Sequence, residues 1–324
     1  MKVRYKRALS PNILKALLPK GVLRFLVSDL PSNDPYALDI QLREKDKLFY
    51  YHGTTSLLTI KLKDVGGNIK IKATADEAYS KRAEYKELMR TWVQAEDDKL
   101  RKAFLAYLPS AIDAANPKCY SKGTEGYWQN RLCIDWGRRA LPREKFIIID
   151  RECAIGSDSK EEMDKFYHAL HKPYAEIRTR LQTNEPKVFG KVREKSFGDE
   201  LDMLALDEQG NLVVIELKYG SNLSGIYWGP LQVLVYRDAF ENKLAEIGRD
   251  IMELVAQKIS LGLLPRAAES RLPVGAFPAV KAVLVIAKPD FGSGWRDRLN
   301  RVITEAKVSA SFDNRDDLSL ITLE

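Results

Sequence analysis

The chain has 324 residues, of which 45% are hydrophobic and 30% are charged, as is ordinary for globular proteins. This length predicts two domains at roughly 100–200 residues each, and the composition excludes a disordered, collagen-like or disulfide-stapled chain. The net charge of +7 is uneven, because residues 1–120 hold 22 Lys+Arg against 14 Asp+Glu, whereas the remaining residues hold 30 against 31. A basic first part suits a polyanionic partner, although a solvated basic surface explains the charge equally well.

The cysteines Cys119, Cys133 and Cys153 lie far apart without a C-x-x-C pair, so they predict neither a zinc site nor a disulfide framework. They are typical of core residues in a reducing compartment. The N-terminus lacks a signal-peptide pattern. The longest strictly apolar run of the chain, Ala282 to Ala287, is far shorter than the roughly 20 residues that span a bilayer. We therefore expect an unprocessed, cytoplasmic protein with no membrane segment.

The first part of the chain predicts a small, basic, mostly β domain. A helix is expected from Pro11 to about Leu18, with Ser10 as its N-cap. Strand-like runs separated by glycine turns follow at 38–42, 48–52, 57–62 and 68–71.

A long helix is expected to close this domain. Thr74 and Glu77 form a capping-box pattern, which predicts a helix from there to about Tyr107, ended by Pro109. Prolines and small polar residues then indicate a linker. The expected division is a domain at 1–110, a linker at 111–123 and a second domain at 124–324.

The second domain is expected to be α/β (α+β), with a mixed central sheet flanked by helices. Ser159 and Glu162 form another capping box at the start of one of its helices. Helices are expected at 125–132, 159–181, 230–244, 247–261 and 295–306. Strands are expected at 146–150, 187–192, 280–287 and 318–323, with a hairpin at 201–218.

The hairpin is the segment that carries chemistry. A turn at 207–211 separates two apolar runs, and symmetric pairing about Gln209 places Asp202 opposite Glu216. Residues two apart on a strand share a face, so Lys218 joins Glu216. Burying the charges of two acids and a lysine at one end of a hydrophobic hairpin costs free energy unless another group compensates these charges.

A hard divalent cation would compensate the two carboxylates, since Mg²⁺ binds one or two carboxylates together with water and substrate phosphate. Lys218 would then orient the attacking water and stabilise charge at phosphorus. The alternative interpretation is a surface hairpin whose acids are solvated and whose lysine forms a salt bridge.

The motif Asp202…Glu216-Leu217-Lys218 resembles the catalytic signature of the PD-(D/E)xK phosphodiesterase superfamily, in particular its RecB-like and mismatch-endonuclease-like branches. Leu201 stands where the name of the superfamily has proline. The resemblance covers roughly residues 120–290 and implies a restriction-endonuclease-like fold. It implies that Asp202, Glu216 and the backbone carbonyl of Leu217 hold the metal.

Further catalytic residues are implied by the same resemblance. Gln232 and Tyr236 are four residues apart on the expected helix after the hairpin, so they share a face and could both look back at the site. Glu125 resembles the helix glutamate that the superfamily places ahead of its sheet, and Glu162 and Glu176 compete with it for that role.

Two other groups have both functional and ordinary interpretations. His168 and His171 have a spacing that a metal accepts, but without a third ligand nearby a packed or exposed pair is favoured. Aromatic and basic residues interleave at 79–86, and Lys6, Arg7 and Arg24 add further positive charge. These could contact nucleic acid, although acids on the same helix favour a solvated face.

The leading hypothesis is a Mg²⁺-dependent nuclease, with Mn²⁺ as a substitute, that hydrolyses phosphodiester bonds in DNA. The resemblance suggests a role in restriction, repair or defence against mobile DNA. The first alternative is a catalytically inactive nucleic-acid-binding protein that keeps the fold. A second is that residues 1–110 bind a protein partner. Double-strand cleavage would need two active sites and so implies a homodimer.

Overall fold

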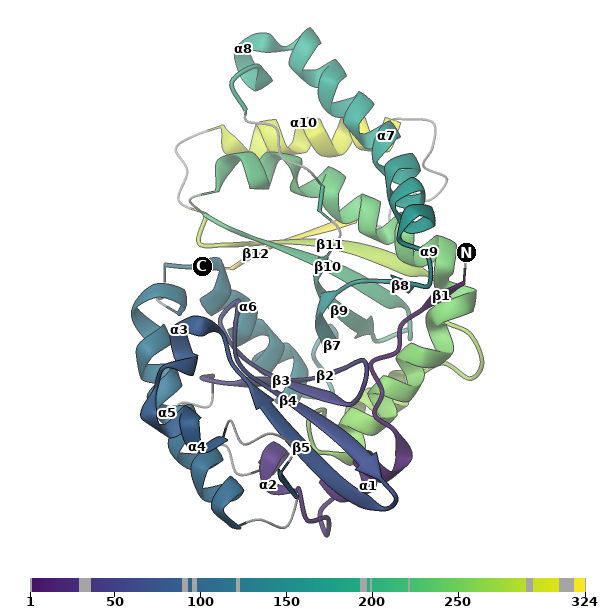
Figure 1. Ribbon diagram of the computed structural model, residues 1–324. Coiled ribbons are helices and arrows are strands. Elements are labelled where there is room, and N and C mark those ends of the chain that lie inside the picture. The colour runs from purple at the N-terminus through teal and green to yellow at the C-terminus, as the bar shows by residue number, and fades with distance from the viewer. Residues whose placement is uncertain are drawn as a thin grey trace. The chain divides into compact units, whose positions relative to one another are not determined.

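The computed structural model describes residues 2–28, 36–88, 93–94, 98–120, 123–192, 197–198, 200–220, 222–289, 294–308 and 318–323. It contains two compact units (Figure 1). The first unit comprises residues 1–5, 150–248 and 273–324, and the second comprises residues 6–149 and 249–272.

This division differs from the expected one. Helix α5 spans Asp98–Cys119, so most of the expected linker at 111–123 is helical. Residues 249–272 group with the N-terminal part of the chain rather than with the second expected domain.

The first unit is built on a five-stranded mixed sheet with the order β12-β11-β10-β9-β7. β10 is antiparallel to β9 and parallel to β11, and β11 is parallel to β12. The strands of this sheet are β7 Phe146–Cys153, β9 Leu201–Asp207, β10 Leu212–Tyr219, β11 Val280–Ala287 and β12 Leu318–Leu323. Residues of β7 from Asp150 onward belong to this unit. β1 Val3–Arg4 and β8 Gly156–Ser157 form a separate two-stranded sheet.

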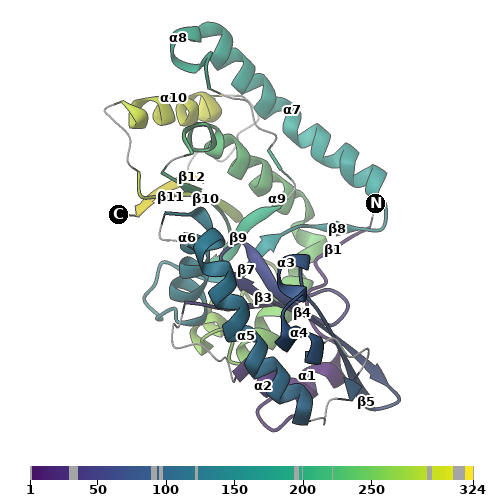
Figure 2. The same ribbon diagram turned by 60° about the vertical axis from the view of Figure 1, so that its left-hand side comes forward.

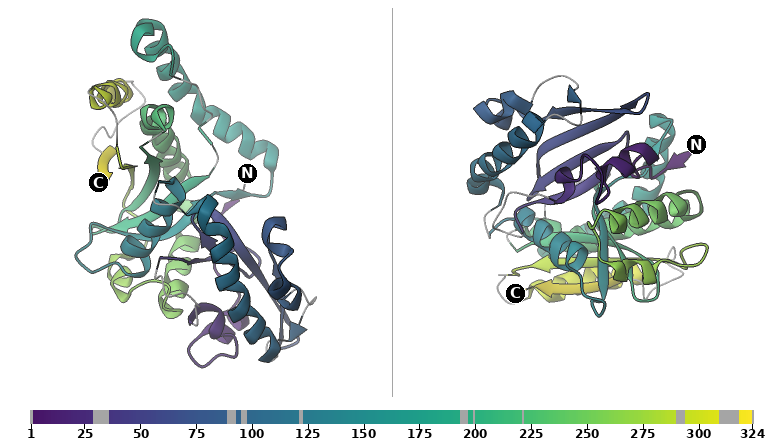
Figure 3. Two further views of the ribbon diagram at one scale, coloured as in Figure 1. Left: turned by 90° about the vertical axis from the view of Figure 1, so that its left-hand side faces the viewer. Right: turned by 90° about the horizontal axis from the view of Figure 1, so that it is seen from below.

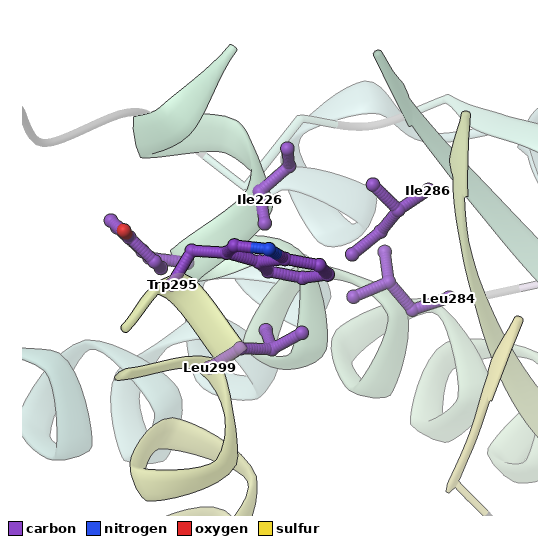
Figure 4. Packing of buried hydrophobic residues seen from close by; sticks show 6 residues of the cluster. Ile226, Leu284, Ile286, Trp295 and Leu299 are labelled. Atoms are coloured by element: carbon purple, nitrogen blue, oxygen red, sulfur yellow. The ribbon is translucent and has the colours of Figure 1, made fainter. Parts of the chain in front are cut away.

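Two helices connect the parallel strands of the first unit. α9 Leu223–Ser260 joins β10 to β11, and α10 Trp295–Val308 lies between β11 and β12 in the sequence. Ile226 and Tyr227 of α9 pack with Leu284 and Ile286 of β11 and with Trp295 and Leu299 of α10 in one buried cluster (Figure 4). These helices therefore cover one face of the sheet.

A glycine allows α9 to approach β11 closely. A Cβ atom at Gly229 would lie 2.9 Å from Leu284 Cδ1, closer than real Cβ contacts. α7 Lys160–Asn184 packs in turn on α9, where Tyr174 Oη donates to Asp238 Oδ2 at 2.5 Å. The short helix α8 Pro186–Phe189 follows α7.

The second unit is built on a five-stranded antiparallel sheet with the order β2-β3-β4-β5-β6. Its strands are β2 Asp39–Arg43, β3 Lys47–His52, β4 Thr55–Val65, β5 Asn68–Thr74 and β6 Val93–Gln94. The helices of this unit are α1 Pro11–Leu17, α2 Phe25–Ser28, α3 Glu77–Ser80, α4 Ala83–Leu88, α5 and α6 Glu125–Cys133, together with a π-helix at Ile134–Arg138 and a 3₁₀-helix at Arg266–Arg271.

One face of this antiparallel sheet forms the core of the second unit. α5 lies along β3 and β4 (Figures 2 and 3), where Phe104 meets Tyr50 edge to face at 5.5 Å. Tyr107 Oη donates to the Leu57 carbonyl oxygen at 2.8 Å. Both tyrosines and Phe104 are fully buried.

Most of the expected elements are confirmed, including the hairpin, the flanking strands and the helix of 125–132. The mixed α/β class is confirmed as well. The expected strand at 187–192 is wrong, because Pro186 starts the short helix α8 there. The expected helices at 230–244 and 247–261 are one continuous helix, α9.

The expected long helix after Thr74 is also wrong. Asp76, not Thr74, caps α3, and its side chain accepts from the Ala78 N–H. The chain then forms three separate helices, and α5 continues through Pro109. Within the described residues, none of the helices combines the length and the apolar character needed to cross a bilayer.

Candidate active site

The hairpin of β9 and β10 brings Asp202 and Glu216 to its open end. Its register pairs Leu212 with Leu206 and Ile215 with Met203, as the sequence predicts, and the pairing ends there. Continued by one residue, this register sets Glu216 opposite Asp202. Directly opposed residues have Cβ atoms about 4.5–5.5 Å apart. We call Asp202, Glu216, Leu217, Lys218 and Gln232 the hairpin site.

Asp202 links the two strands at the open end of the hairpin. Its Oδ2 accepts a hydrogen bond from the Leu217 N–H at 2.7 Å, and its side chain is half-buried. A carboxylate that accepts a backbone N–H has a fixed orientation, so Asp202 is held in place beside the backbone of Leu217.

Glu216 and Lys218 form a buried ion pair. Lys218 Nζ donates to Glu216 Oε1, and the two residues are 1% and 7% exposed. The parallel register with β11 places Glu216 beside Leu284 and Lys218 beside Ile286. Residues paired in this way point to the same side of a sheet, so the pair lies on the face that α9 and α10 cover. Glu216 is therefore not solvated, in contrast to the alternative interpretation, whereas the salt bridge that this interpretation gave to Lys218 is present.

Gln232 and Tyr236 occupy one face of α9, and Gln232 Nε2 donates to Tyr236 Oη at 3.3 Å. Burial raises the pKa of Tyr236, and the negative charges of Glu216 and Asp202 raise it further. The negative charges of both carboxylates thus disfavour ionisation of the Tyr236 hydroxyl. Tyr236 stays neutral at physiological pH and is unsuited to act as a base.

Tyr236 holds the segment that leads into β9. Its hydroxyl lies 3.0 Å from the Phe197 carbonyl oxygen and 2.7 Å from that of Glu200. Gly198 adopts φ +75°, and a Cβ atom there would lie 2.9 Å from Tyr236 Oη. Only glycine meets both conditions without strain. A glycine shortly before an acidic strand is a sequence signal for such a turn, and Gly198 is a residue near the hairpin site that the motif alone does not indicate.

Glu125 is not brought to the hairpin site by the contacts within either unit. It begins α6 in the second unit, whereas the hairpin site belongs to the first. The competing Glu162 and Glu176 lie on α7 in the first unit and are exposed.

A cleft of about 700 Å³ runs along α7 and is lined in part by His168, His171, Glu176 and Phe197. The His171 ring packs edge-on to Phe197 at 5.5 Å, and the Arg178 guanidinium lies 5.1 Å from the same ring. The favoured interpretation of His171 as a packed residue is thus confirmed.

The donors of the hairpin site fit a hard divalent cation. Asp202, Glu216 and the Leu217 carbonyl are all oxygen donors, which Mg²⁺ and Mn²⁺ prefer over nitrogen or sulfur. In the part of the chain that the structure describes, groups of three or more His, Cys, Asp or Glu side chains suited to a metal do not occur. A metal ion at the hairpin site would therefore have two carboxylates and a carbonyl as its protein ligands.

Comparisons with known proteins do not assign the chain to a family. No protein-family model, no curated protein and no solved structure matches it.

Proposed function

We propose that the protein is a metal-dependent nuclease that hydrolyses phosphodiester bonds in DNA. The observation that supports this best is the open end of the hairpin, where Asp202 accepts from the Leu217 N–H and the neighbouring Glu216 is paired with Lys218. Gln232 on α9 donates to Tyr236, and the charges of Glu216 and Asp202 raise the pKa of that tyrosine. The restriction-endonuclease-like type of fold belongs to this proposal as well.

In this proposal Asp202, Glu216 and the Leu217 carbonyl hold Mg²⁺, or Mn²⁺ in its place. When bound, such an ion would supply Lewis-acid polarisation of the phosphate and a lowered pKa of a coordinated water molecule. Lys218 orients the attacking water through its ammonium group and stabilises the negative charge that develops on the phosphate oxygens. Gln232 positions the substrate or the water through its amide, and Tyr236 acts only through Gln232 and the Phe197 segment.

A second candidate function is nucleic-acid binding without catalysis. The burial of Glu216 and Lys218 favours it, because a buried ion pair is also a structural element. This candidate predicts DNA binding that survives EDTA and the Glu216→Gln change, with no cleavage.

The test is cleavage of supercoiled plasmid, linear DNA and RNA by the purified protein with Mg²⁺, Mn²⁺ or EDTA. Asp202→Asn, Glu216→Gln and Lys218→Met are each expected to lower the rate at least about a hundredfold, as the loss of one charge-stabilising group does. Lys281→Met is the matched control, since Lys281 pairs with Asp207 at 2.8 Å at the turn end of the same hairpin. It perturbs the hairpin but should retain cleavage.

Two results would contradict the proposal. Cleavage that is equal in the three site variants would belong to a contaminant. An absence of cleavage of any substrate with either metal, while folding and binding are intact, would leave the binding candidate.

A further inference from the structure

Lysines are stacked in register across three strands of the antiparallel sheet of the second unit. Lys61 on β4 is paired with Lys47 on β3 and with Lys72 on β5. Two residues further along β4, Lys63 is paired with Lys70. We call Lys47, Lys61, Lys63, Lys70 and Lys72 the lysine ladder.

The ladder occupies the sheet face that points away from α5. Leu48, Ile60, Leu62 and Ile71, which alternate with these lysines, are buried at 2% or less. Lys61 and Lys63 are exposed, and Lys47, Lys70 and Lys72 are half-exposed. Since side chains alternate between the two faces of a strand, all five lysines project from the opposite face.

The same face is closed at its β2 edge. Gln41 of β2 is paired with Phe49 of β3 and is buried, because Lys258 Nζ donates to Gln41 Oε1 at 2.7 Å. The open part of the face therefore coincides with β3, β4 and β5, which carry the ladder.

Like charges on directly opposed residues of a sheet repel each other. Neighbouring strands are about 4.8 Å apart, and residues two apart on one strand about 6.6 Å. The ladder thus concentrates five positive charges on a small grid. The phosphates of a polyanion would offset this repulsion. Each lysine that contacts a phosphate also releases a counterion, and the released counterions gain entropy.

We propose that the lysine ladder is a binding surface for the phosphate backbone of nucleic acid. The contacts are with phosphates, so the surface binds DNA without sequence preference. This inference is independent of catalysis at the hairpin site, because it concerns the second unit and requires no metal. It also replaces the residues that the sequence pattern of 79–86 suggested, since Tyr79 and Tyr85 are buried and cannot stack on bases.

The experiment measures binding of a labelled DNA duplex to the full-length protein in EDTA, over a series of salt concentrations. The ladder variant combines Lys61→Gln, Lys63→Gln, Lys70→Gln and Lys72→Gln. The control variant has the same net charge and combines Lys81→Gln, Lys86→Gln, Lys99→Gln and Lys102→Gln. These are four exposed lysines, of which the first directly follows α3, the second lies on α4 and the last two lie on α5.

Each phosphate contact adds about 0.9 to the slope of log K against log salt on duplex DNA. We expect the ladder variant to lose about 3 to 4 from the slope and about tenfold or more in affinity at 0.1 M salt. The control variant should lose less than about one from the slope. Equal binding by the ladder variant and the wild type, or an equal loss in the control variant, overturns the proposal.

A second measurement needs no variant. Lysine acetylation of the wild-type protein, read by mass spectrometry, should be slower at the ladder when DNA is bound and unchanged at Lys81 and Lys99. Acetylation of the ladder that is insensitive to DNA overturns the proposal. So does protection of the ladder by vesicles of anionic phospholipid when DNA gives none, since the partner would then be a membrane surface.

Discussion

The buried ion pair of Glu216 and Lys218 is expensive to break, whatever its function. A carboxylate that is 1% exposed has lost its hydration, and removal of the cation beside it leaves that charge uncompensated. Breaking such pairs typically costs about 3–5 kcal/mol, whereas replacing both partners by apolar side chains of similar size is often nearly neutral.

We therefore predict that Lys218→Met lowers the free energy of unfolding by about 3 kcal/mol. The double variant with Glu216→Met should regain most of that loss. Urea unfolding in EDTA measures both values and excludes any contribution from a metal. Additive effects of the two changes would show that the two charges are not coupled in the folded protein.

At the scale of elements, the hairpin could be predicted from the sequence, because its two apolar runs and its turn allow one register. Continued toward the open end of the hairpin, this register brings Asp202 and Glu216 together. The turn is reinforced by Asp207, whose carboxylate accepts from the backbone N–H groups of Gln209 and Asn211. Hydrogen bonds from Lys281 and Asn211 lower the pKa of Asp207 in spite of its burial. Local sequence and tertiary contacts agree here.

Predictions from the sequence are wrong where tertiary packing outweighs local signals. Pro109 was expected to end a helix, but Phe104, Leu108 and Ala111 are fully buried, and this packing carries α5 past the proline. Such packing routinely overrides intrinsic helix propensity. The lysine ladder was missed for a different reason, because strand register between three strands is invisible until the pairing is known.

The ladder predicts an effect of its own on stability. Lys72 faces Lys61 directly, so Lys72→Glu replaces a repulsive pair by an attractive one. We expect the free energy of unfolding to rise by a few tenths of a kcal/mol at low salt without DNA. The gain should fade toward 1 M salt, where the screening length is about 3 Å. Thermal unfolding at both salt concentrations tests this, and a loss of stability at low salt would contradict the repulsion.

At the scale of the whole molecule, both units bury tyrosines. Burial raises the pKa of Tyr50 and Tyr107 in the second unit and of Tyr174 and Tyr236 in the first. In an unfolded chain the pKa of tyrosine is about 10. Below pH 10 these tyrosines are protonated in both the folded and the unfolded protein, so their contribution to the free energy of unfolding is fully present. Above pH 10 only the unfolded chain ionises them readily, so stability is lost as the pH rises.

Each such tyrosine adds about 1.4 kcal/mol per pH unit to the fall of the free energy of unfolding above pH 10. We predict that Tyr107→Phe combined with Tyr236→Phe, one residue from each unit, makes this fall less steep by about 2.7 kcal/mol per pH unit. Urea unfolding between pH 9 and 11.5 gives the slope, and absorbance at 295 nm follows tyrosine ionisation. An unchanged slope, with all tyrosines ionising near pH 10 before unfolding, would mean that these hydroxyls reach solvent in the folded protein. A reduced slope would show that both buried hydroxyls, including the one that holds the Phe197 segment beside the hairpin site, remain protonated until the chain unfolds.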